Sequence, residues 1–436
     1  WHSQRGKDFK SFVSTNFTTR ARPSETVSLL NFYKILYNDM SIKKKIISIL
    51  FTVLFIIISV TLYETDKKYE ALKIKSKKQE AIIQNQVSFI NDQNLTHEQL
   101  VKKKLESILF KKISNSDTIK LDIFDKKRNL TIFKNNKQLA RGINNFFPGS
   151  AYIDIDQDKL FLASATGLLA YTNNDFDKKI EFKQIKNNIN EFLSFKEMEK
   201  GNWFSVKDIL IFKNKVFISY TNELLEDCWN TSIIFADLNL NNLNFKNFFQ
   251  PKDCVKSSGN IDNEFNAHQS GGKLHKFDNN NIIFSTGDFR LRSNAQSKKS
   301  LLGKIIKISI SSRDHEIISL GHRNPQGLLY NEKFDYIIST EHGPFGGDEI
   351  NLNLNPLSDV KNFGWATSSY GEHYGGKDSS ENKDKYIKYP LHKSHSKYGF
   401  IEPIKYYVPS IGISEIIQIS DEKFIVSSLK DSSIYP

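Results

Sequence analysis

The sequence predicts an all-β domain with a radial, propeller-type arrangement of sheets, preceded by one transmembrane helix and a helical stalk. Three observations lead to this prediction. A hairpin-like unit recurs along the second part of the chain, an uncharged apolar run lies near its start, and a polar segment without proline or glycine separates the two. With 39% hydrophobic and 25% charged residues, the composition excludes collagen-like and fully disordered proteins.

The net charge of +12 comes mainly from lysine, because only 9 of the 61 basic residues are arginine. Specific recognition of nucleic acid favours arginine, whose planar guanidinium contacts bases and phosphates with two hydrogen bonds. We therefore interpret the charge as a solvated basic surface and predict no nucleic-acid partner.

The membrane segment is Ile46–Tyr63, in which all 18 residues are uncharged. As a helix this run spans about 27 Å, close to the thickness of a bilayer core. Lys43–Lys45 precede it, so the positive-inside rule places its N-terminal side in the cytoplasm. A cleaved signal peptide is the alternative. The pattern favours a single-pass anchor in the inner (cytoplasmic) membrane with the remaining chain in the periplasm.

The regions flanking the anchor complete the predicted domain organisation. Met40 begins a stretch typical of a natural protein start, so we interpret residues 1–39 as upstream or disordered sequence and residues 40–63 as the cytoplasmic start and anchor. Residues 64–117 are rich in Lys, Gln and Glu and predict a helical stalk. Within it, Thr96 and Gln99 resemble a capping box at the start of a helix.

A repeated β unit begins after about residue 118. Each copy has a short strand, a polar turn and a second, mostly apolar strand, as expected for a strand buried on both faces. The copies begin near residues 153, 209, 274, 328 and 416 and read IDIDQDKLFLASATG, ILIFKNKVFISYTNE, LHKFDNNNIIFSTGD, LLYNEKFDYIISTEH and IIQISDEKFIVSSLK. A hairpin at such a long, regular spacing is typical of a β-propeller, with an irregular β-sandwich as the alternative. We assign residues 118–436 to this domain, incomplete at its C-terminal end.

The two cysteines, Cys228 and Cys254, are 26 residues apart in this domain. A disulfide between them suits an extracytoplasmic compartment, and two free buried thiols are the alternative. Two cysteines alone do not form a zinc site.

Three polar, glycine-marked segments lie where strands end: residues 266–273, 321–327 and 341–351. Loops at one end of a propeller converge, so these segments are candidates for one site. His268 is a candidate general base, and Asp288 ends the partner strand of the same hairpin, where a carboxylate is placed to hold one imidazole nitrogen. A surface or core histidine is the alternative.

Two further acidic residues, Asp348 and Glu349, are candidates either for binding a cation or for capping their loop, and the sequence leaves both open. Neither a G-x-S-x-G nor an H-E-x-x-H motif is present, so serine-hydrolase and zinc-protease mechanisms lack support.

Five motifs, in this order, resemble the glucose/sorbosone dehydrogenases. They are HQSGG before a strand with STGD after it, GHRNPQG, EHGPFGGDEIN followed by NFGW, PSIGIS at 409–414 and SLK at 428–430. These proteins are quinoprotein aldose sugar dehydrogenases related to soluble glucose dehydrogenase. The resemblance covers roughly residues 200–436. It implies a six-bladed propeller whose last blade is truncated here, and oxidation of an aldose or related alcohol.

The resemblance also implies pyrroloquinoline quinone (PQQ) and Ca²⁺ as cofactors. His268 matches the base that takes the sugar hydroxyl proton while hydride passes to the quinone, and Asp288 matches its orienting carboxylate. The cofactor contacts match Arg323, Asn324 and Lys430, and the backbone carbonyls that bind Ca²⁺ match Gly343 and Pro344. Two alternatives remain: a non-catalytic propeller that binds glycans or proteins, and a Ca²⁺-dependent propeller lactonase.

Overall fold

The computed structural model describes residues 42–91, 115–123, 126–134, 151–174, 182–201, 203–430 and 433–436. The chain divides into two compact units, Trp1–His97 and Glu98–Pro436, which are described separately. The predicted upstream segment 1–39 lies outside the described residues. So does the part of the stalk that contains Thr96 and Gln99.

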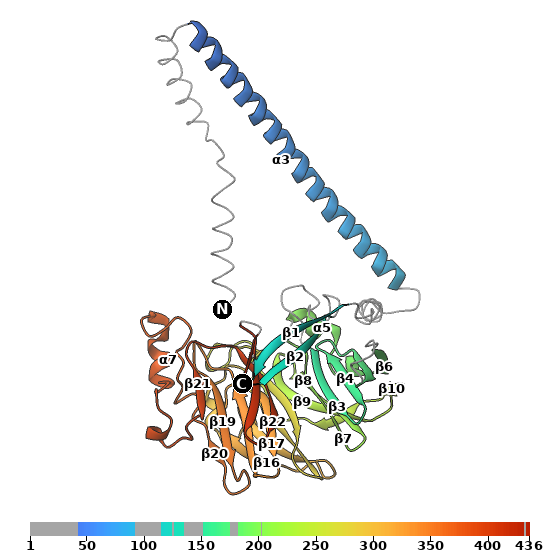
Figure 1. Ribbon diagram of the computed structural model, residues 1–436, viewed down its shortest axis with the longest axis vertical. Coiled ribbons are helices and arrows are strands. Elements are labelled where there is room, and N and C mark those ends of the chain that lie inside the picture. Colours follow the sequence, from blue (N-terminus) through green and yellow to red (C-terminus); the bar gives the residue numbers. More distant parts are fainter. Residues whose placement is uncertain are drawn as a thin grey trace. The chain divides into compact units, whose positions relative to one another are not determined.

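The first unit contains the long helix α3 (Ile42–Asn91), drawn in blue in Figure 1. The predicted apolar run and the first part of the predicted stalk are therefore one continuous helix. Within it, Ile49–Glu70 is long and apolar enough to cross a membrane. Its large apolar side chains are exposed, and Phe51 and Phe55 expose 69% and 67% of their surfaces.

The second unit contains five multi-stranded sheets among its described residues, and each sheet opens with one of the five predicted hairpins. The first sheet consists of β3 (Ala151–Asp156), β4 (Lys159–Ser164), β5 (Leu169–Asn173), β6 (Lys183–Asn187) and β10 (Asn242–Leu243). The second consists of β7 (Val206–Phe212), β8 (Lys215–Leu225), β9 (Cys228–Asp237), β11 (Lys246–Phe249) and β12 (Val255–Lys256). The third consists of β13 (Gly271–Lys276), β14 (Asn281–Thr286), β15 (Lys304–Ser309), β16 (His315–Leu320) and β20 (Lys361–Asn362).

The last two sheets are shorter. The fourth consists of β17 (Pro325–Asn331), β18 (Tyr336–Glu341), β19 (Asp348–Leu354) and β21 (Lys405–Tyr407). The fifth consists of β22 (Ile413–Ser420), β23 (Lys423–Ser428) and β24 (Ile434–Tyr435). A separate antiparallel hairpin, β1 (Asn115–Ile123) with β2 (Lys126–Lys134), precedes them. Short helices α5 (Phe195–Lys200), α6 (Ser293–Gln296) and α7 (Lys383–Lys388) lie in the connections.

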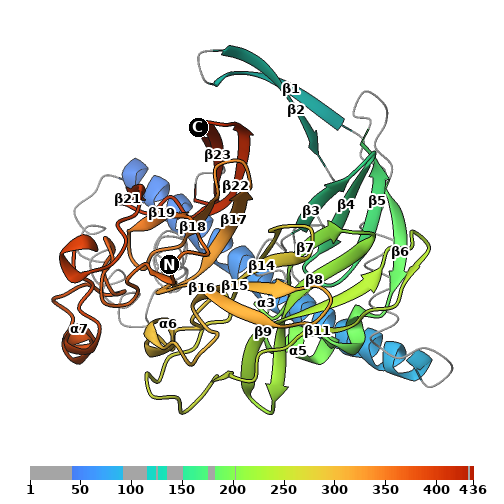
Figure 2. The same ribbon diagram turned by 90° about the horizontal axis from the view of Figure 1, so that it is seen from below.

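The sheets are arranged radially, as the hairpin spacing predicts. The first strand of each sheet contacts the first strand of the next, in the order β3, β7, β13, β17 and β22. Figure 2 shows the result as a fan of sheets around a common centre, running from green for β3–β6 through yellow to red for β22 and β23. The described part of the second unit is therefore an all-β, propeller-type domain with five blades.

Apolar layers between neighbouring sheets form the core. Along β14, Ile282 and Phe284 pack toward the second sheet, whereas Ile283 packs toward the fourth. Successive side chains of a strand point to opposite faces, so a strand with neighbours on both sides is expected to be apolar over most of its length. This explains the unbroken apolar runs that mark the second strand of each predicted hairpin.

Charged side chains from three inner strands meet in the interior of the fan. The Lys273 ammonium on β13 pairs with Asp208 Oδ1 on β7 at 3.1 Å and with the Glu415 carboxylate on β22. Asp208 Oδ2 also accepts a hydrogen bond from the Leu274 amide at 2.8 Å. These contacts join the second, third and fifth sheets.

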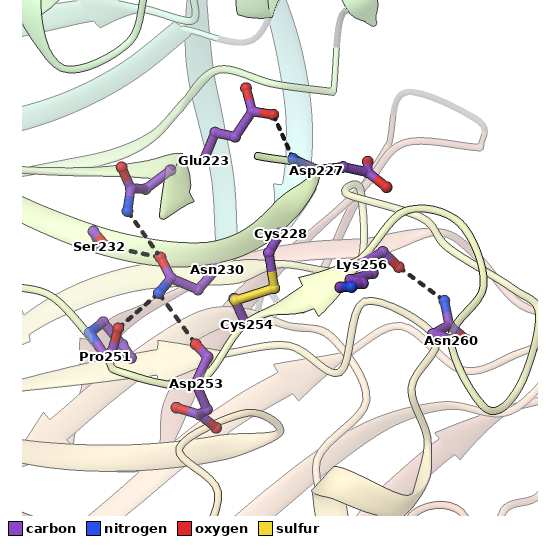
Figure 3. Close-up of a disulfide and its surroundings, with 11 residues drawn as sticks. Glu223, Asp227, Cys228, Asn230, Ser232, Pro251, Asp253, Cys254, Lys256 and Asn260 are labelled. Carbon is purple, nitrogen blue, oxygen red and sulfur yellow. Dashed lines mark hydrogen bonds between the residues drawn. A yellow bond between two sulfur atoms is a disulfide. The ribbon is translucent and has the colours of Figure 1, made fainter. Parts of the chain in front are cut away.

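Cys228 and Cys254 form a disulfide, which decides between the two alternatives left by the sequence. Figure 3 shows that the bond fastens the segment after β11 to the start of β9. Beside it, Asn230 Nδ2 donates to the carbonyls of Pro251 at 2.9 Å and Asp253 at 3.2 Å. The chain continues from this segment through β12 and a loop to His268.

Candidate active site

His268 lies in the turn that enters β13. Its backbone N–H donates to Asn266 Oδ1 at 2.8 Å, and the backbone N–H of Gln269 donates to the Asn266 carbonyl at 3.0 Å. The half-buried imidazole meets the ring of Trp203 edge to face, with 5.5 Å between the ring centres. The turn and the indole together fix the direction of the imidazole.

The surroundings of His268 favour its neutral form. Burial is the largest influence and, with the positive charge of Lys207 and further contributions from His342 and Arg290, lowers the pKa of His268 from 6.5 to about 4. At neutral pH the imidazole is therefore unprotonated and able to accept a proton.

Asp288 follows β14 and is completely buried. Its Oδ2 accepts a hydrogen bond from Trp365 Nε1 at 2.7 Å, and its Oδ1 accepts one from the backbone N–H of Arg290 at 2.8 Å. Burial raises the pKa of this carboxyl, and Arg323 opposes that rise. The carboxylate thus orients an indole and a tight turn, and its link toward His268 passes through Gln269.

Gln269 forms hydrogen bonds to several site residues, although the sequence analysis did not identify it. In the amide orientation that satisfies both of its terminal atoms, its nitrogen donates to Asp288 Oδ1 at 3.1 Å. Its oxygen accepts from Arg290 Nε at 3.1 Å and from Arg323 Nη2 at 2.9 Å. The residue next to the candidate base therefore holds two arginines and a carboxylate together.

Arg323 and Asn324 precede β17 and are buried. Arg323 Nη1 donates to the His342 carbonyl at 2.8 Å, and its guanidinium lies 5.4 Å from the centre of the Trp365 ring. Asn324 Oδ1 accepts from the backbone N–H of Gly271 at 3.1 Å, which ties this segment to the turn that carries His268.

Gly343 and Pro344 begin the tight turn between β18 and β19. A Cβ on Gly343 would lie 2.1 Å from the Gly347 carbonyl oxygen, so only glycine fits there. Among the described residues, neither the Gly343 nor the Pro344 carbonyl accepts a hydrogen bond. Both are oxygen donors of the type that Ca²⁺ prefers. In the described part of the chain, no group of three His, Cys, Asp or Glu side chains is arranged for a metal ion.

Asp348 has the capping role that the sequence left open. Its Oδ1 accepts from the Gly343 amide at 3.0 Å and from the Ser410 hydroxyl at 2.9 Å. Its Oδ2 accepts from the amides of Gly412 at 2.7 Å and Ile413 at 3.0 Å. Glu349 is also buried, with Oε1 lying 3.3 Å from His395 Nε2.

Lys430 follows β23 and is exposed. Its Nζ donates to the Ser410 carbonyl at 3.2 Å. Because the Ser410 hydroxyl bonds to Asp348, which accepts the Gly343 amide, three hydrogen bonds connect Lys430 to the Gly343 turn.

The seven predicted site residues thus lie on one series of contacts across the third, fourth and fifth sheets, made of hydrogen bonds between segments and of peptide bonds between neighbours such as His268 and Gln269. The series runs through His268, Gln269, Asp288, Arg323, Asn324, His342, Gly343, Pro344, Asp348, Ser410 and Lys430. The sequence analysis missed Gln269 and Arg290, although each directly adjoins a residue or motif that it identified.

Comparison with known proteins identifies the family. The model of the glucose/sorbosone dehydrogenase family matches residues 212–435, just over half of the 436-residue chain. The chain belongs to this family, as its motifs predict.

Among its relatives is the aldose sugar dehydrogenase YliI of Escherichia coli, which is 30% identical over 185 residues. That match covers 38% of this chain and 46% of YliI, so the chain spans less than half the length of this relative. Two solved structures are also similar. The soluble aldose sugar dehydrogenase of Escherichia coli in its apo form has a TM-score of 0.47 and 20% identity, covering 65% of this chain and 85% of that one. The PQQ-bound aldose sugar dehydrogenase of Streptomyces coelicolor has a TM-score of 0.45 and 14% identity, covering 66% and 80%.

Proposed function

We propose that this protein is a PQQ-dependent dehydrogenase of aldose sugars or related alcohols, anchored in the inner membrane with its propeller in the periplasm. The series of contacts from His268 to Lys430 is the observation that carries this proposal. A binding propeller would need the glycine-rich turns for its shape. It would not need a neutral imidazole, buried arginines and a lysine joined across three sheets.

His268 would act as the general base. Its lowered pKa leaves a ring nitrogen unprotonated at neutral pH, where it would accept the proton of the substrate hydroxyl. Trp203 and the Asn266 turn hold the imidazole in place. Asp288 would act indirectly on His268, because it accepts a hydrogen bond from Gln269 and so orients the residue next to the base.

The cationic side chains suit a cofactor that carries carboxylates. PQQ has three, and Lys430 and Arg323 would hold it by charge-assisted hydrogen bonds. Asn324 would contribute through Nδ2, because its Oδ1 is bonded to Gly271. When bound, PQQ would supply the hydride acceptor that no amino-acid side chain provides. We expect a sixth blade to complete the ring, as in the family that the motifs resemble.

Gly343 and Pro344 would bind Ca²⁺ through their backbone carbonyls. The turn is too tight for a side chain at position 343, and Asp348 fixes it from the side by accepting the Gly343 amide. Asp348 already accepts four hydrogen bonds, so it would position the carbonyls and would not itself be a ligand.

The anchor would be the apolar part of helix α3. Its exposed side chains over Ile49–Glu70 suit lipid contact, and the disulfide suits an oxidising compartment. Fractionation of cells that express the full chain tests this point. An anchored protein stays in the membrane pellet after a carbonate wash, whereas a mature N-terminus near residue 64 would indicate a cleaved signal peptide.

Reconstitution tests the activity. The full chain with PQQ and Ca²⁺ should oxidise aldoses with a dye as electron acceptor. His268→Ala should lower kcat by ~10²–10⁴ and leave PQQ binding intact, because it removes only the base. Lys430→Ala should weaken PQQ binding. A full chain that binds no PQQ at micromolar concentration with Ca²⁺ present would refute the proposal.

A further inference from the structure

Arg290 has a side chain whose hydrogen-bonding capacity is only partly used. Its Nε donates to the Gln269 oxygen, and its Nη1 lies 3.9 Å from Glu264 Oε2, beyond hydrogen-bonding distance. Glu264 is already paired with Arg292 Nη2 at 2.7 Å and with Lys385. Within the described residues, the terminal nitrogens of Arg290 therefore have no close carboxylate of their own.

The backbone holds Arg290 in a conformation that needs support. Phe289 and Arg290 have φ angles of 51° and 72°, in the left-handed region that residues with a side chain rarely adopt. The carboxylate of Asp288 stabilises this turn by accepting the Arg290 amide. Such backbone conformations concentrate at functional sites, where the surrounding structure maintains them.

Tyr374 lies against the same guanidinium, with 5.4 Å between Arg290 Cζ and the centre of the ring. Its side chain is 40% exposed. The segment that carries it is fixed at two points. Phe345, from the turn that contains Gly343, pairs with Glu372, and Asn382 Nδ2 donates to the Tyr374 carbonyl at 2.9 Å. An exposed aromatic face thus lies beside a partly unpaired guanidinium.

We propose that Arg290 and Tyr374 form a binding subsite beside His268 for a carboxylate carried on a ring. The guanidinium would bind the carboxylate through its two terminal nitrogens, and the exposed aromatic face would pack against the ring. Backbone hydrogen bonds hold the two segments together, because the Phe289 amide donates to the Gln269 carbonyl at 2.9 Å and the Asn266 amide donates to the Phe289 carbonyl at 3.1 Å. The inference rests on the proposed function, because the quinone cofactor of that function carries carboxylates on its rings. An aldose substrate of the uronate class would also carry a carboxylate on a ring.

Binding measurements without turnover distinguish the two sources. Calorimetry on the full chain with Ca²⁺ measures the Kd of PQQ and, separately, that of glucuronate, with glucose as the uncharged control. If the cofactor is the ligand, Arg290→Gln should raise the Kd of PQQ about tenfold or more and leave glucuronate and glucose unaffected. If the sugar acid is the ligand, the same variant should raise the Kd of glucuronate by that factor and leave PQQ and glucose unaffected.

Further variants separate the subsite from a folding defect. Tyr374→Ala should weaken the same ligand as Arg290→Gln, whereas Tyr374→Phe should retain binding because it keeps the ring. Arg313→Gln is the matched control, since Arg313 also lies over an aromatic ring but in the turn after β15. Unchanged melting temperatures would show that the variants are folded.

Two results would overturn the subsite. One is an Arg290→Gln variant that binds PQQ and glucuronate as the wild type does. The other is a wild-type chain that binds neither compound. A chain that binds glucuronate through Arg290 but neither binds PQQ nor oxidises aldoses would retain the subsite and refute the proposed function.

Discussion

Trp365 Nε1 donates a hydrogen bond of 2.7 Å to Asp288 Oδ2, although the two residues are 77 positions apart in the chain. The bond joins the turn after β14 to the segment after β20, and both partners are buried. The carboxylate that the sequence assigns to His268 is therefore anchored first by an indole. Trp365 also lies beside the guanidinium of Arg323, so it contacts two of the predicted site residues.

Trp365→Phe should lower the free energy of unfolding by about 1–3 kcal/mol, because it leaves a buried Asp288 oxygen without its donor. Urea denaturation measures this change. Trp203→Phe is a matched control, since within the described structure the Trp203 Nε1 is buried without a hydrogen-bond partner, and its loss should cost less. Equal losses in the two variants would show that the Asp288 bond adds no stability.

His268 should titrate near pH 4 and not near pH 6.5. Because the pKa of His268 is lower in the folded state, its neutral form contributes stability above pH 6.5 that is lost as the pH falls through about 4. NMR titration of the imidazole measures this pKa. Lys207→Met removes a nearby positive charge and should raise it, and a bound carboxylate ligand should raise it as well. A wild-type midpoint near 6.5 would contradict the described surroundings.

Reduction of the Cys228–Cys254 disulfide should lower the free energy of unfolding by about 3 kcal/mol, because the bond closes a loop of 26 residues. Denaturation with and without reductant measures the loss. A double Cys228→Ser/Cys254→Ser variant should match the reduced wild type and show no further response to reductant. Identical stability of the oxidised and reduced protein would argue against a formed bond.

Asp348→Ala should destabilise the domain by about 3 kcal/mol, since it leaves the buried Ile413 amide and the partly buried Gly343 and Gly412 amides without an acceptor. It should also weaken Ca²⁺ binding, because the Gly343 turn loses its lateral support. The exposed Asp359 is the control, and its replacement by alanine should change stability by no more than about 0.5 kcal/mol. A stable Asp348→Ala variant would contradict the capping role.

The architecture could be predicted because its unit is local. Each hairpin pairs two strands that are adjacent in sequence, and a strand with neighbours on both faces is expected to be apolar over most of its length. Sequence spacing therefore predicts both the hairpins and their radial order. The long helix was also predictable in its apolar part, because a continuous uncharged run needs no tertiary partner to be recognised.

The roles within the site were less predictable, because their partners are distant in sequence. Asp348 was open between a cation ligand and a cap, and the answer lies in Ser410 and Gly412, more than 60 residues further on. Arg290 was missed because nothing in STGDFR indicates that Gln269 and Tyr374 would lie beside it. The motifs predict which residues lie together in the site. The role of each residue depends on hydrogen bonds to other motifs, which the sequence does not predict.

The Lys273 ammonium should lower the free-energy cost of ionising Asp208 inside the domain. Burial raises the pKa of Asp208 to about 7, even though Lys273 opposes that rise. Burial would lower the pKa of Lys273, but Asp208 and Glu415 raise it above its usual value. Lys273→Met would leave a buried carboxylate without its cation, and we expect a loss of about 3–5 kcal/mol at pH 7.

The pH dependence of this loss distinguishes an electrostatic cause from a packing defect. A carboxyl whose folded-state pKa is raised contributes stability below its unfolded pKa of about 4, and this contribution is lost as the pH rises through about 7. Without Lys273 the pKa of Asp208 should rise further, so the penalty of Lys273→Met should be smallest near pH 4 and grow toward pH 8. Adding Asp208→Asn to this variant should remove most of the pH dependence, since the amide cannot ionise. Urea denaturation of the three proteins between pH 4 and 8 measures both effects, and a penalty that stays constant over this range would assign the loss to packing.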